Sequence, residues 1–169
     1  DSDCTDDNKV TQYPAKFPAG TTTYYAKWDP DEAEIVFNAN DGDASSVPDG
    51  ITGVTDGKIT ETFPTDDPTR EGYTFEGWYL TAAGTGEKVT EYPDNFPVGT
   101  TTYYAKWTAD EAKIEFNANK GKNPPDGIEG VTDEEITDRT LPTGEPTRVG
   151  YTFKGWYKEK ECKNAWSFT

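Results

Sequence analysis

The sequence predicts an extended array of small, strand-dominated modules, and its internal repeats are the observation that predicts it. Three segments recur at an offset of 78 or 79 residues: 21–28 (TTTYYAKW) at 100–107, 32–40 (EAEIVFNAN) at 111–119 (EAKIEFNAN), and 68–79 (PTREGYTFEGWY) at 146–157 (PTRVGYTFKGWY). This period is too long for the common helical solenoid repeats. Each copy is therefore expected to be a small domain of its own.

The same repeats set the expected module boundaries. One complete module is expected over residues 29–107. Residues 1–28 match only the C-terminal part of a module, and residues 108–169 match all of it except its last strand. The chain is therefore expected to start and stop inside repeats, as an internal piece of a longer protein would.

The chain has 169 residues, a formal net charge of −16 and no His. Because this charge repels phosphates and anionic lipid surfaces, we expect neither nucleic-acid binding nor membrane insertion. Aromatic residues make up 14% of the chain, and their regular spacing argues against disorder. The charge is unevenly shared: residues 1–28 hold 4 acids and 3 bases (−1), 29–107 hold 16 and 4 (−12), and 108–169 hold 12 and 9 (−3). A charged patch common to every copy is therefore not expected.

The first expected strand of the complete module covers residues 34–39. Polar and apolar residues alternate there, as in a strand with one buried face. The inner face would carry Ile35, Phe37 and Ala39. The Asp-, Gly- and Ser-rich segment 40–50 that follows is expected to be a loop.

The middle of the module is expected to be less regular. Residues 51–63 suggest one or two short strands interrupted by glycines, and residues 65–72 form a turn region. Residues 73–79 are a second clear strand. Gly77 is expected to mark a bulge or a close backbone approach in it, because glycine otherwise weakens a strand interior.

The third clear strand, residues 100–107, closes the module. Tyr104 and Trp107 are candidates for its core. Only five residues separate Trp107 from the KIEF of the next copy. So short a connection limits bending, so we expect a semi-rigid rod.

These motifs resemble the Listeria–Bacteroides repeat, also called the internalin B-repeat. GYTFEGWY at 72–79, a variable loop, TTTYYAKW at 100–107 and the preceding IVFNAN at 35–40 carry the resemblance, which covers essentially the whole chain. It implies an α+β, β-grasp-like (ubiquitin/SUMO-like) fold, repeated in tandem in large surface or secreted proteins of bacteria. The residues themselves show no amphipathic helix, so the helix implied by the family is expected in a loop such as 65–72 or 90–96.

Catalytic chemistry has few candidate groups in this chain. Without His, the usual general base and the Ser-His and Cys-His pairs are missing. Carboxylate pairs can act as acid and base in glycosidases. Here, however, the acidic residues cluster in loops, and many are replaced in the other copy. We therefore expect no catalytic residues, no cofactor and no enzymatic activity.

Two acidic stretches, 1–7 and 38–46, have a calcium-like composition, since calcium is bound by several convergent oxygens. In the second copy, Asp41 and Asp43 are replaced by lysines, which puts two cations where the metal would sit. We therefore expect acidic turns and no metal site. A single adventitious calcium site is the alternative.

The two cysteines align with almost the same loop of two different modules. Cys4 corresponds to Ala83 and Cys162 to Gly84. A disulfide needs Cα atoms within about 7 Å, which an extended rod does not provide for these residues. Both are expected to be free thiols, with intermolecular pairing as the alternative.

The aromatic residues of the TTTYYAKW segments suggest a glycan-binding hypothesis, because such rings stack on sugars. Alternation puts Tyr24 and Trp28 on one face and Tyr25 on the other, and one face must supply the core. The tryptophans of the complete module are expected in that core. Tyr25 and Tyr104 are the better candidates for exposed contacts with a host protein or glycan.

The incomplete copies predict a further partner. Residues 108–169 leave a sheet edge unpaired, and residues 1–28 carry the strand that would pair with it. Head-to-tail association between molecules, with the strand donated in trans, is therefore expected.

The sequence favours a non-catalytic stalk or spacer of an extracellular protein, on the bacterial cell surface or secreted. The alternative is an adhesion module that binds a host receptor, a matrix glycoprotein or a glycan. A binding site should recur on exposed positions of each copy. Changes such as Glu76 to Lys154 at equivalent positions therefore favour the stalk.

Overall fold

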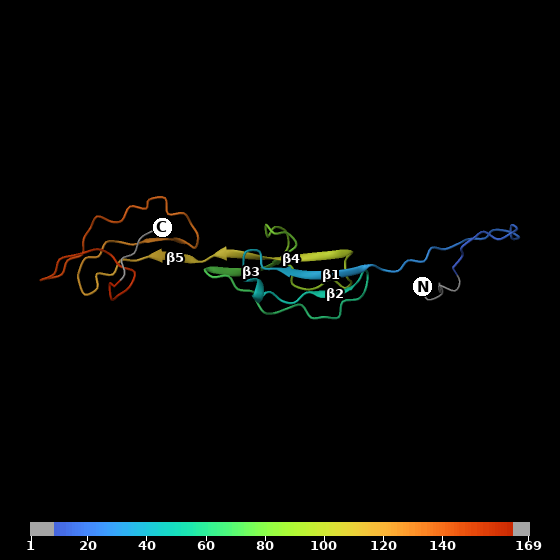
Figure 1. Ribbon diagram of the computed structural model, residues 1–169, viewed down its shortest axis with the longest axis horizontal. Coiled ribbons are helices and arrows are strands. Elements are labelled where there is room, and N and C mark those ends of the chain that lie inside the picture. The colour runs from blue at the N-terminus through green and yellow to red at the C-terminus, as the bar shows by residue number, and fades with distance from the viewer. Residues whose placement is uncertain (1–8, 164–169) are drawn as a thin grey trace.

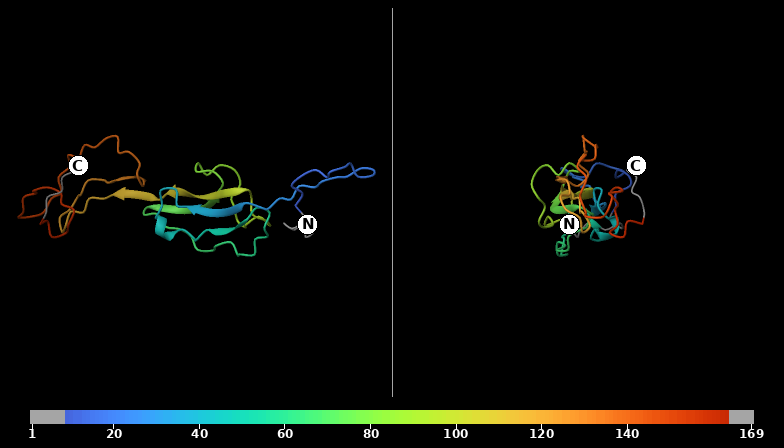
Figure 2. Two further views of the ribbon diagram at one scale, coloured as in Figure 1. Left: turned by 45° about the vertical axis from the view of Figure 1, so that its right-hand side comes forward. Right: turned by 90° about the vertical axis from the view of Figure 1, so that its left-hand side faces the viewer.

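Six strands and one very short helix make up the regular structure of residues 9–163, the part of the chain described by the computed structural model. In order, these are β1 (Glu32–Asn38), the 3-10 helix η2 (Ala44–Ser46), β2 (Ile51–Val54), β3 (Tyr73–Tyr79), β4 (Gly99–Ala109), β5 (Glu111–Ile114) and β6 (Ile128–Val131). The molecule is elongated, with the sheet of β1–β4 near its middle (Figures 1 and 2). No helix in this part of the chain is long and apolar enough to cross a bilayer.

The central sheet has the strand order β2-β1-β4-β3. β1 runs parallel to β4, while the β1–β2 and β3–β4 pairs are antiparallel. β5 and β6 form a separate antiparallel pair. The strands predicted at 34–39, 73–79 and 100–107 are confirmed, because β1, β3 and β4 occupy these positions and β4 extends two residues further at its C-terminus.

The core lies on one face of the central sheet. Ile35 and Ala105 are completely buried, and Trp78, Phe96 and Tyr103 pack around them. The inner face predicted for the first strand is confirmed, since its apolar residues are all less than 10% exposed. β1 shows this alternation most clearly, because it buries every second side chain from Ala33 to Phe37.

The core position predicted for Tyr104 is wrong. Tyr103 is 3% exposed and belongs to the core, whereas Tyr104 is half-buried on the opposite face. Adjacent strand residues point to opposite faces, so only one of the two tyrosines can be inside. Trp107 is half-buried at the edge of the core, where its ring lies 5.5 Å from that of Phe75 and its Nε1 donates to the carbonyl of Ala39 at 2.8 Å.

The bulge predicted at Gly77 is confirmed. The register between β3 and β4 shifts between Phe75 and Gly77, and Gly77 has a φ of +143°. A side chain at this position would meet the Lys88 side chain, whose Nζ donates to the carbonyl of Glu76 at 2.6 Å. The bulge therefore makes room for a lysine that crosses the back of the strand.

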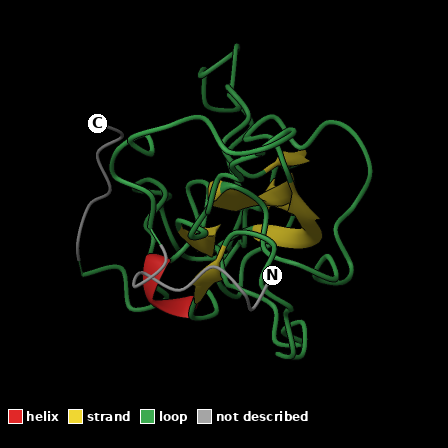
Figure 3. Cartoon of the chain, turned by 90° about the vertical axis from the view of Figure 1, so that its right-hand side faces the viewer, coloured by secondary structure: helices red, strands yellow, loops and turns green. Residues whose placement is uncertain are grey.

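The helix expected at 65–72 or 90–96 does not form. Both segments are irregular, and only the three residues of η2 are helical in the described part of the chain (Figure 3). Pro68 and Pro93 interrupt these short segments. Residues 90–96 instead pair with residues 57–59. The amide of Ile59 donates to the carbonyl of Asp94, and the amide of Phe96 donates to the carbonyl of Gly57. These bonds hold Phe96 in the core at 4% exposure.

Candidate functional site

The clearest organised site is the joint where the first module meets the second. β4 ends at Ala109 and β5 begins at Glu111, so only Asp110 separates the two strands. This link is shorter than the five residues expected from the repeats. The two strands follow one another in nearly the same direction (Figure 1).

Asp110 is hydrogen-bonded to both modules. Towards the first module, its amide donates to the carbonyl of Gly72 at 2.9 Å, and its carboxylate accepts from the Thr74 hydroxyl at 2.6 Å. Towards the second module, its carbonyl accepts from the amide of Thr132 at 2.9 Å and from the Thr132 hydroxyl at 3.3 Å. One residue thus binds both the start of β3 and the residue after the end of β6.

A second bond crosses the joint beside Asp110. The Tyr73 hydroxyl donates to Asp133 Oδ2 at 2.8 Å. This bond, above all other causes, raises the pKa of Tyr73, because the neighbouring carboxylate favours the protonated phenol. The Arg70 guanidinium lies over the face of the Tyr73 ring, with its Cζ 3.7 Å from the ring centre.

The backbone at the joint is shaped for close contact. Gly72 has a φ of +75°, and a Cβ on it would lie 2.6 Å from Thr132 Cγ2. Asp133 has a φ of +62° in the turn after β6, where the amide of Glu134 bonds to the carbonyl of Val131. A left-handed turn thus presents the Asp133 carboxylate to the facing tyrosine.

Both halves of this joint recur elsewhere in the chain. At the other end of the first module, the amide of Thr55 donates to the carbonyl of Asp31 at 2.8 Å, as that of Thr132 does to Asp110. In the second module, Arg148 lies 3.7 Å from the Tyr151 ring centre, as Arg70 does for Tyr73. Each module therefore carries one half of a joint at each end.

Sequence reasoning missed this joint, although its residues repeat. The signal is in three short matches: DEA at 31–33 and 110–112, VTD at 54–56 and 131–133, and GYT at 72–74 and 150–152. They are separated in the sequence and carry common residue types. Only the fold shows that they meet.

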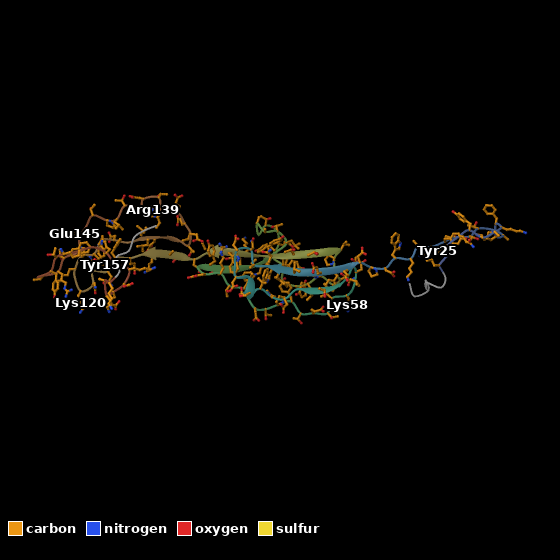
Figure 4. All side chains as sticks on the ribbon, viewed as in Figure 1. Tyr25, Lys58, Lys120, Arg139, Glu145 and Tyr157 are labelled. Atoms are coloured by element: carbon orange, nitrogen blue, oxygen red, sulfur yellow. The ribbon has the colours of Figure 1, made fainter. Side chains whose placement is uncertain are left out.

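The exposed-contact candidates do not form a common surface. Tyr25 is 83% exposed on the segment before β1, well away from the central sheet (Figure 4). Tyr104 is half-buried on β4, opposite Tyr79 on β3. The Lys106 ammonium lies 5.2 Å from the Tyr79 ring centre and shares this outer face.

The cysteine and acidic-loop residues can be placed in part. Cys162 is an exposed free cysteine, whereas Cys4 lies outside the described residues.

In the 38–46 loop, Asp43 Oδ1 accepts from the amide and hydroxyl of Ser45 at 2.8 and 2.7 Å. These bonds lower the pKa of Asp43 and cap η2. Residues 9–163 contain no group of three or more His, Cys, Asp and Glu side chains arranged to hold a metal ion.

A shallow depression beside η2 is lined by Ser45, Ser46, Val47, Pro48, Asp49, Pro64 and Asp66. It is open to solvent, and its two carboxylates are not joined there by another acidic or basic group. The described residues thus place their most extensive polar network at the joint between the modules.

Comparison with known proteins identifies relatives of the chain. The family model of the Listeria-Bacteroides repeat domain matches residues 34–106 and 113–169. A putative Gly-rich membrane protein of Evansella cellulosilytica is 31% identical over 144 residues, which cover 85% of this chain and 15% of the relative. A putative membrane protein of the same organism is 32% identical over 150 residues, covering 86% of this chain and 20% of the relative.

A third relative is internalin H of Listeria monocytogenes, which is 36% identical over 104 residues, 60% of this chain and 17% of that protein. The chain thus corresponds to a fifth or less of the length of each relative. No solved structure matches the chain significantly.

Proposed function

Because the chain belongs to the Listeria-Bacteroides repeat family, we propose that it is a non-catalytic spacer in the stalk of a bacterial cell-surface or secreted protein. Its relatives include an internalin and two putative membrane proteins, which associates this repeat with the cell envelope. In this role, the modules hold another part of the parent protein at a distance. Their negative charge keeps the array soluble.

The joint is the observation that carries this proposal. A spacer must keep the parts that it separates at a fixed distance, and a flexible link between modules would let that distance vary. Here a single residue separates β4 from β5, and Asp110 is bonded to Gly72, Thr74 and Thr132. Because the half-joints recur in each module, the same stiffness would extend along a longer array.

We also propose that the complete module is a β-grasp-like domain with a much reduced helix. The strand order β2-β1-β4-β3, with a central parallel pair flanked by antiparallel strands, supports this proposal. η2 lies in the connection between β1 and β2, and the connections from β2 to β3 and from β3 to β4 contain no helix. Backbone chemical shifts would test this arrangement, since a continuous helix anywhere in 40–98 would contradict it.

The distance distribution between two spin labels tests the spacer function. One label goes on Lys58→Cys in the first module and the other on Glu129→Cys in β6, both exposed positions, with Cys4→Ser and Cys162→Ser as background. A single narrow distribution is expected. A broad distribution, as a flexible tether gives, would contradict the proposal.

The adhesive alternative is separated from the spacer by binding to glycan and matrix-protein arrays at physiological and high salt. Tyr25 is strongly exposed, which favours this alternative, but Tyr104 is not. Saturable binding that survives high salt and is lost in Tyr25→Ala would establish adhesion. No binding at either salt leaves the spacer function as the account of this region.

A further inference from the structure

The second module replaces acidic and apolar side chains of the first module with basic ones. Four lysines occupy positions at which the first module has two carboxylates and two apolar side chains. These are Lys120, Lys122, Lys158 and Lys160, at the positions of Asp41, Asp43, Leu80 and Ala82. All four lysines are exposed. In a chain with a formal net charge of −16, they are a local reversal of charge.

Hydrogen bonds bring these lysines together from two loops. Asn119 Nδ2 donates to the carbonyl of Lys160 at 3.0 Å, which joins the two loops. On the other side of the first loop, the amide of Lys122 donates to the carbonyl of Thr147 at 2.8 Å, next to the exposed Arg148. The five cations form a surface that we call the basic band: Lys120, Lys122, Arg148, Lys158 and Lys160.

The same contacts hold the equivalent surface of the first module. There, Asn40 Nδ2 donates to the carbonyl of Ala82 at 2.8 Å, and the amide of Asp43 donates to the carbonyl of Thr69 at 2.8 Å. The side chains at the positions of the four lysines are exposed in the first module as well, although another module follows it directly. The basic band is therefore an accessible surface of the repeat itself, on which only the side chains differ.

The backbone of the turn does not explain its lysine. Lys120 has a φ of +73°, and its equivalent Asp41 has a φ of +72°. This left-handed region favours glycine, asparagine and aspartate over a long side chain. The turn thus keeps its shape in the second module with a residue that suits it less, and what the replacement adds is a positive charge.

The basic band lies away from the acidic first module, whose residues 29–107 carry a net charge of −12. β5 lies between the joint and the turn, and its four residues alone span about 13 Å. Figure 4 shows Lys120 near the end of the second module that is remote from the joint. Charges more than about 8 Å apart are largely screened at physiological ionic strength. The acidic first module therefore opposes an anion at the basic band only weakly.

Two acidic residues within the basic band restrict the anion that fits it. Glu159 and Glu161 alternate with its lysines in the second loop. Duplex DNA has a charge at about every 1.7 Å of its axis, and an anionic bilayer is a continuous charged surface, so both bring anions against these glutamates. A linear polymer with separated anionic groups can pair with the lysines and pass by the glutamates. Lysine ammonium groups pair with phosphate or sulfate groups as point charges on flexible stems.

We propose that the basic band binds an anionic polysaccharide, through phosphate or sulfate groups that pair with its lysines. The interaction goes beyond the spacer function and does not depend on it. It also differs from adhesion through Tyr25, because it is electrostatic and is lost at high salt. The first module has two carboxylates at the equivalent turn and does not take part.

Titration with three forms of dextran tests the proposal on the whole chain. Sulfated and phosphorylated dextrans of equal length carry the two anionic groups on one backbone, and unmodified dextran is the neutral control. Saturable binding is expected for one or both charged forms and not for the neutral form. The affinity is expected to fall linearly with salt concentration on logarithmic axes, because binding releases counterions. The two charged forms show which anionic group the band prefers.

Lys120→Asp with Lys122→Asp restores the residues that the first module has at these positions and suits the turn. This variant is expected to bind about tenfold more weakly or less, with a salt slope smaller by about two. Lys113→Glu with Arg139→Glu is the matched control. It makes the same change in net charge at two exposed positions outside the basic band and is expected to bind like the unaltered chain.

Chemical shifts of the backbone amides locate the bound polymer. Changes on addition of the charged dextran are expected in residues 119–122 and 158–163. The equivalent turn at 40–43 has the same backbone shape and the opposite charge, so it should not respond. Equal changes in the two turns would contradict an interaction confined to the basic band.

Four further results would overturn the proposal. One is no binding of either charged dextran above that of the neutral form. Another is unchanged binding by the Lys120→Asp and Lys122→Asp variant. The third is an equal loss in the matched control, which would show that only net charge matters. The fourth is equally tight binding of a DNA duplex or of phosphatidylserine vesicles, which would assign the band to a different partner. None of these results bears on the narrow distance distribution that tests the spacer function.

Discussion

Tyr73 and Asp133 are joined across the two modules by a hydrogen bond of 2.8 Å from the tyrosine hydroxyl to the carboxylate. They lie 60 residues apart in the sequence, on β3 of one module and in the turn after β6 of the next. The bond acts together with Asp110, which is bonded to both modules at the link itself. Four predictions test the joint and the core around β4, and a fifth tests the equivalence of the two modules.

Tyr73→Phe is expected to loosen the joint without unfolding the first module. The substitution removes the hydroxyl that reaches Asp133 and keeps the ring that stacks on Arg70. The distance distribution between labels in the two modules should therefore broaden. Tyr151→Phe is the matched control, because Tyr151 stacks on Arg148 in the same way and is 66% exposed. Equal broadening in both variants would show that the Asp133 bond does not hold the joint.

The joint is expected to open at high pH. The pKa of Tyr73 is raised above its usual value of 10.0, chiefly by the hydrogen bond to Asp133. A raised folded-state pKa contributes stability that is fully present below the unfolded value of 10.0 and lost as the pH rises through the higher folded value. The inter-module distance distribution should thus stay narrow to about pH 10 and broaden above it.

Burial also raises the pKa of Tyr103 and, as its largest cause, that of Tyr92, so the first module itself loses stability at high pH. The measurement is therefore the difference between the unaltered chain and Tyr73→Phe. Only the unaltered chain should show the step attributed to the joint. The same pH profile in both would assign the step to the core tyrosines.

Gly72→Ala is expected to disrupt the joint more than Gly150→Ala at the equivalent position. Both glycines have positive φ values, +75° and +81°, so alanine costs about 1–2 kcal/mol of backbone strain at either site. Only Gly72 faces a neighbour closely, since a Cβ there would meet Thr132, whereas Gly150 has open space. The inter-module distance should change for the first variant and not for the second. Identical distances in the two variants would mean that the Thr132 side chain moves aside and leaves the second module in place.

Tyr103→Ala is expected to lower the free energy of unfolding of the first module by about 3–5 kcal/mol, since it empties an aromatic position in the core. The Tyr103 ring lies 5.6 Å from that of Phe37, and the residue is 3% exposed. Tyr104→Ala, on the outer face, is expected to cost no more than about 1 kcal/mol. Denaturant unfolding of the two variants checks this, and similar losses would contradict the assignment of faces.

This pair shows what the sequence could and could not predict. Repeats and alternation predicted the strands at 34–39, 73–79 and 100–107 and the bulge at Gly77, because these signals are local. Alternation also places Tyr103 and Tyr104 on opposite faces of the strand, but the sequence of the strand does not show which face points into the core. That choice depends on β1 and β3, which lie on either side of β4.

The joint was harder to predict, for a related reason. Its residues Gly72, Asp110 and Thr132 come from three separate segments, and a hydrogen bond between them has no periodicity in the sequence.

The prediction of a helix at 65–72 or 90–96 was wrong for a different reason. It was implied by resemblance alone, while Pro93 and the buried Phe96 hold the 90–96 segment extended against residues 57–59.

Asn40→Ala and Asn119→Ala test the equivalence of the two modules. Asn40 bonds two carbonyls, one of them partly buried on β4, so its loss is expected to destabilise the first module by about 1–3 kcal/mol. Asn119 bonds only one equivalent carbonyl, that of Lys160, so its loss should cost the single chain less. Hydrogen exchange of the two modules in the two variants measures the two losses. Equal losses would contradict the prediction, because they would show that the second carbonyl bond of Asn40 adds nothing to stability.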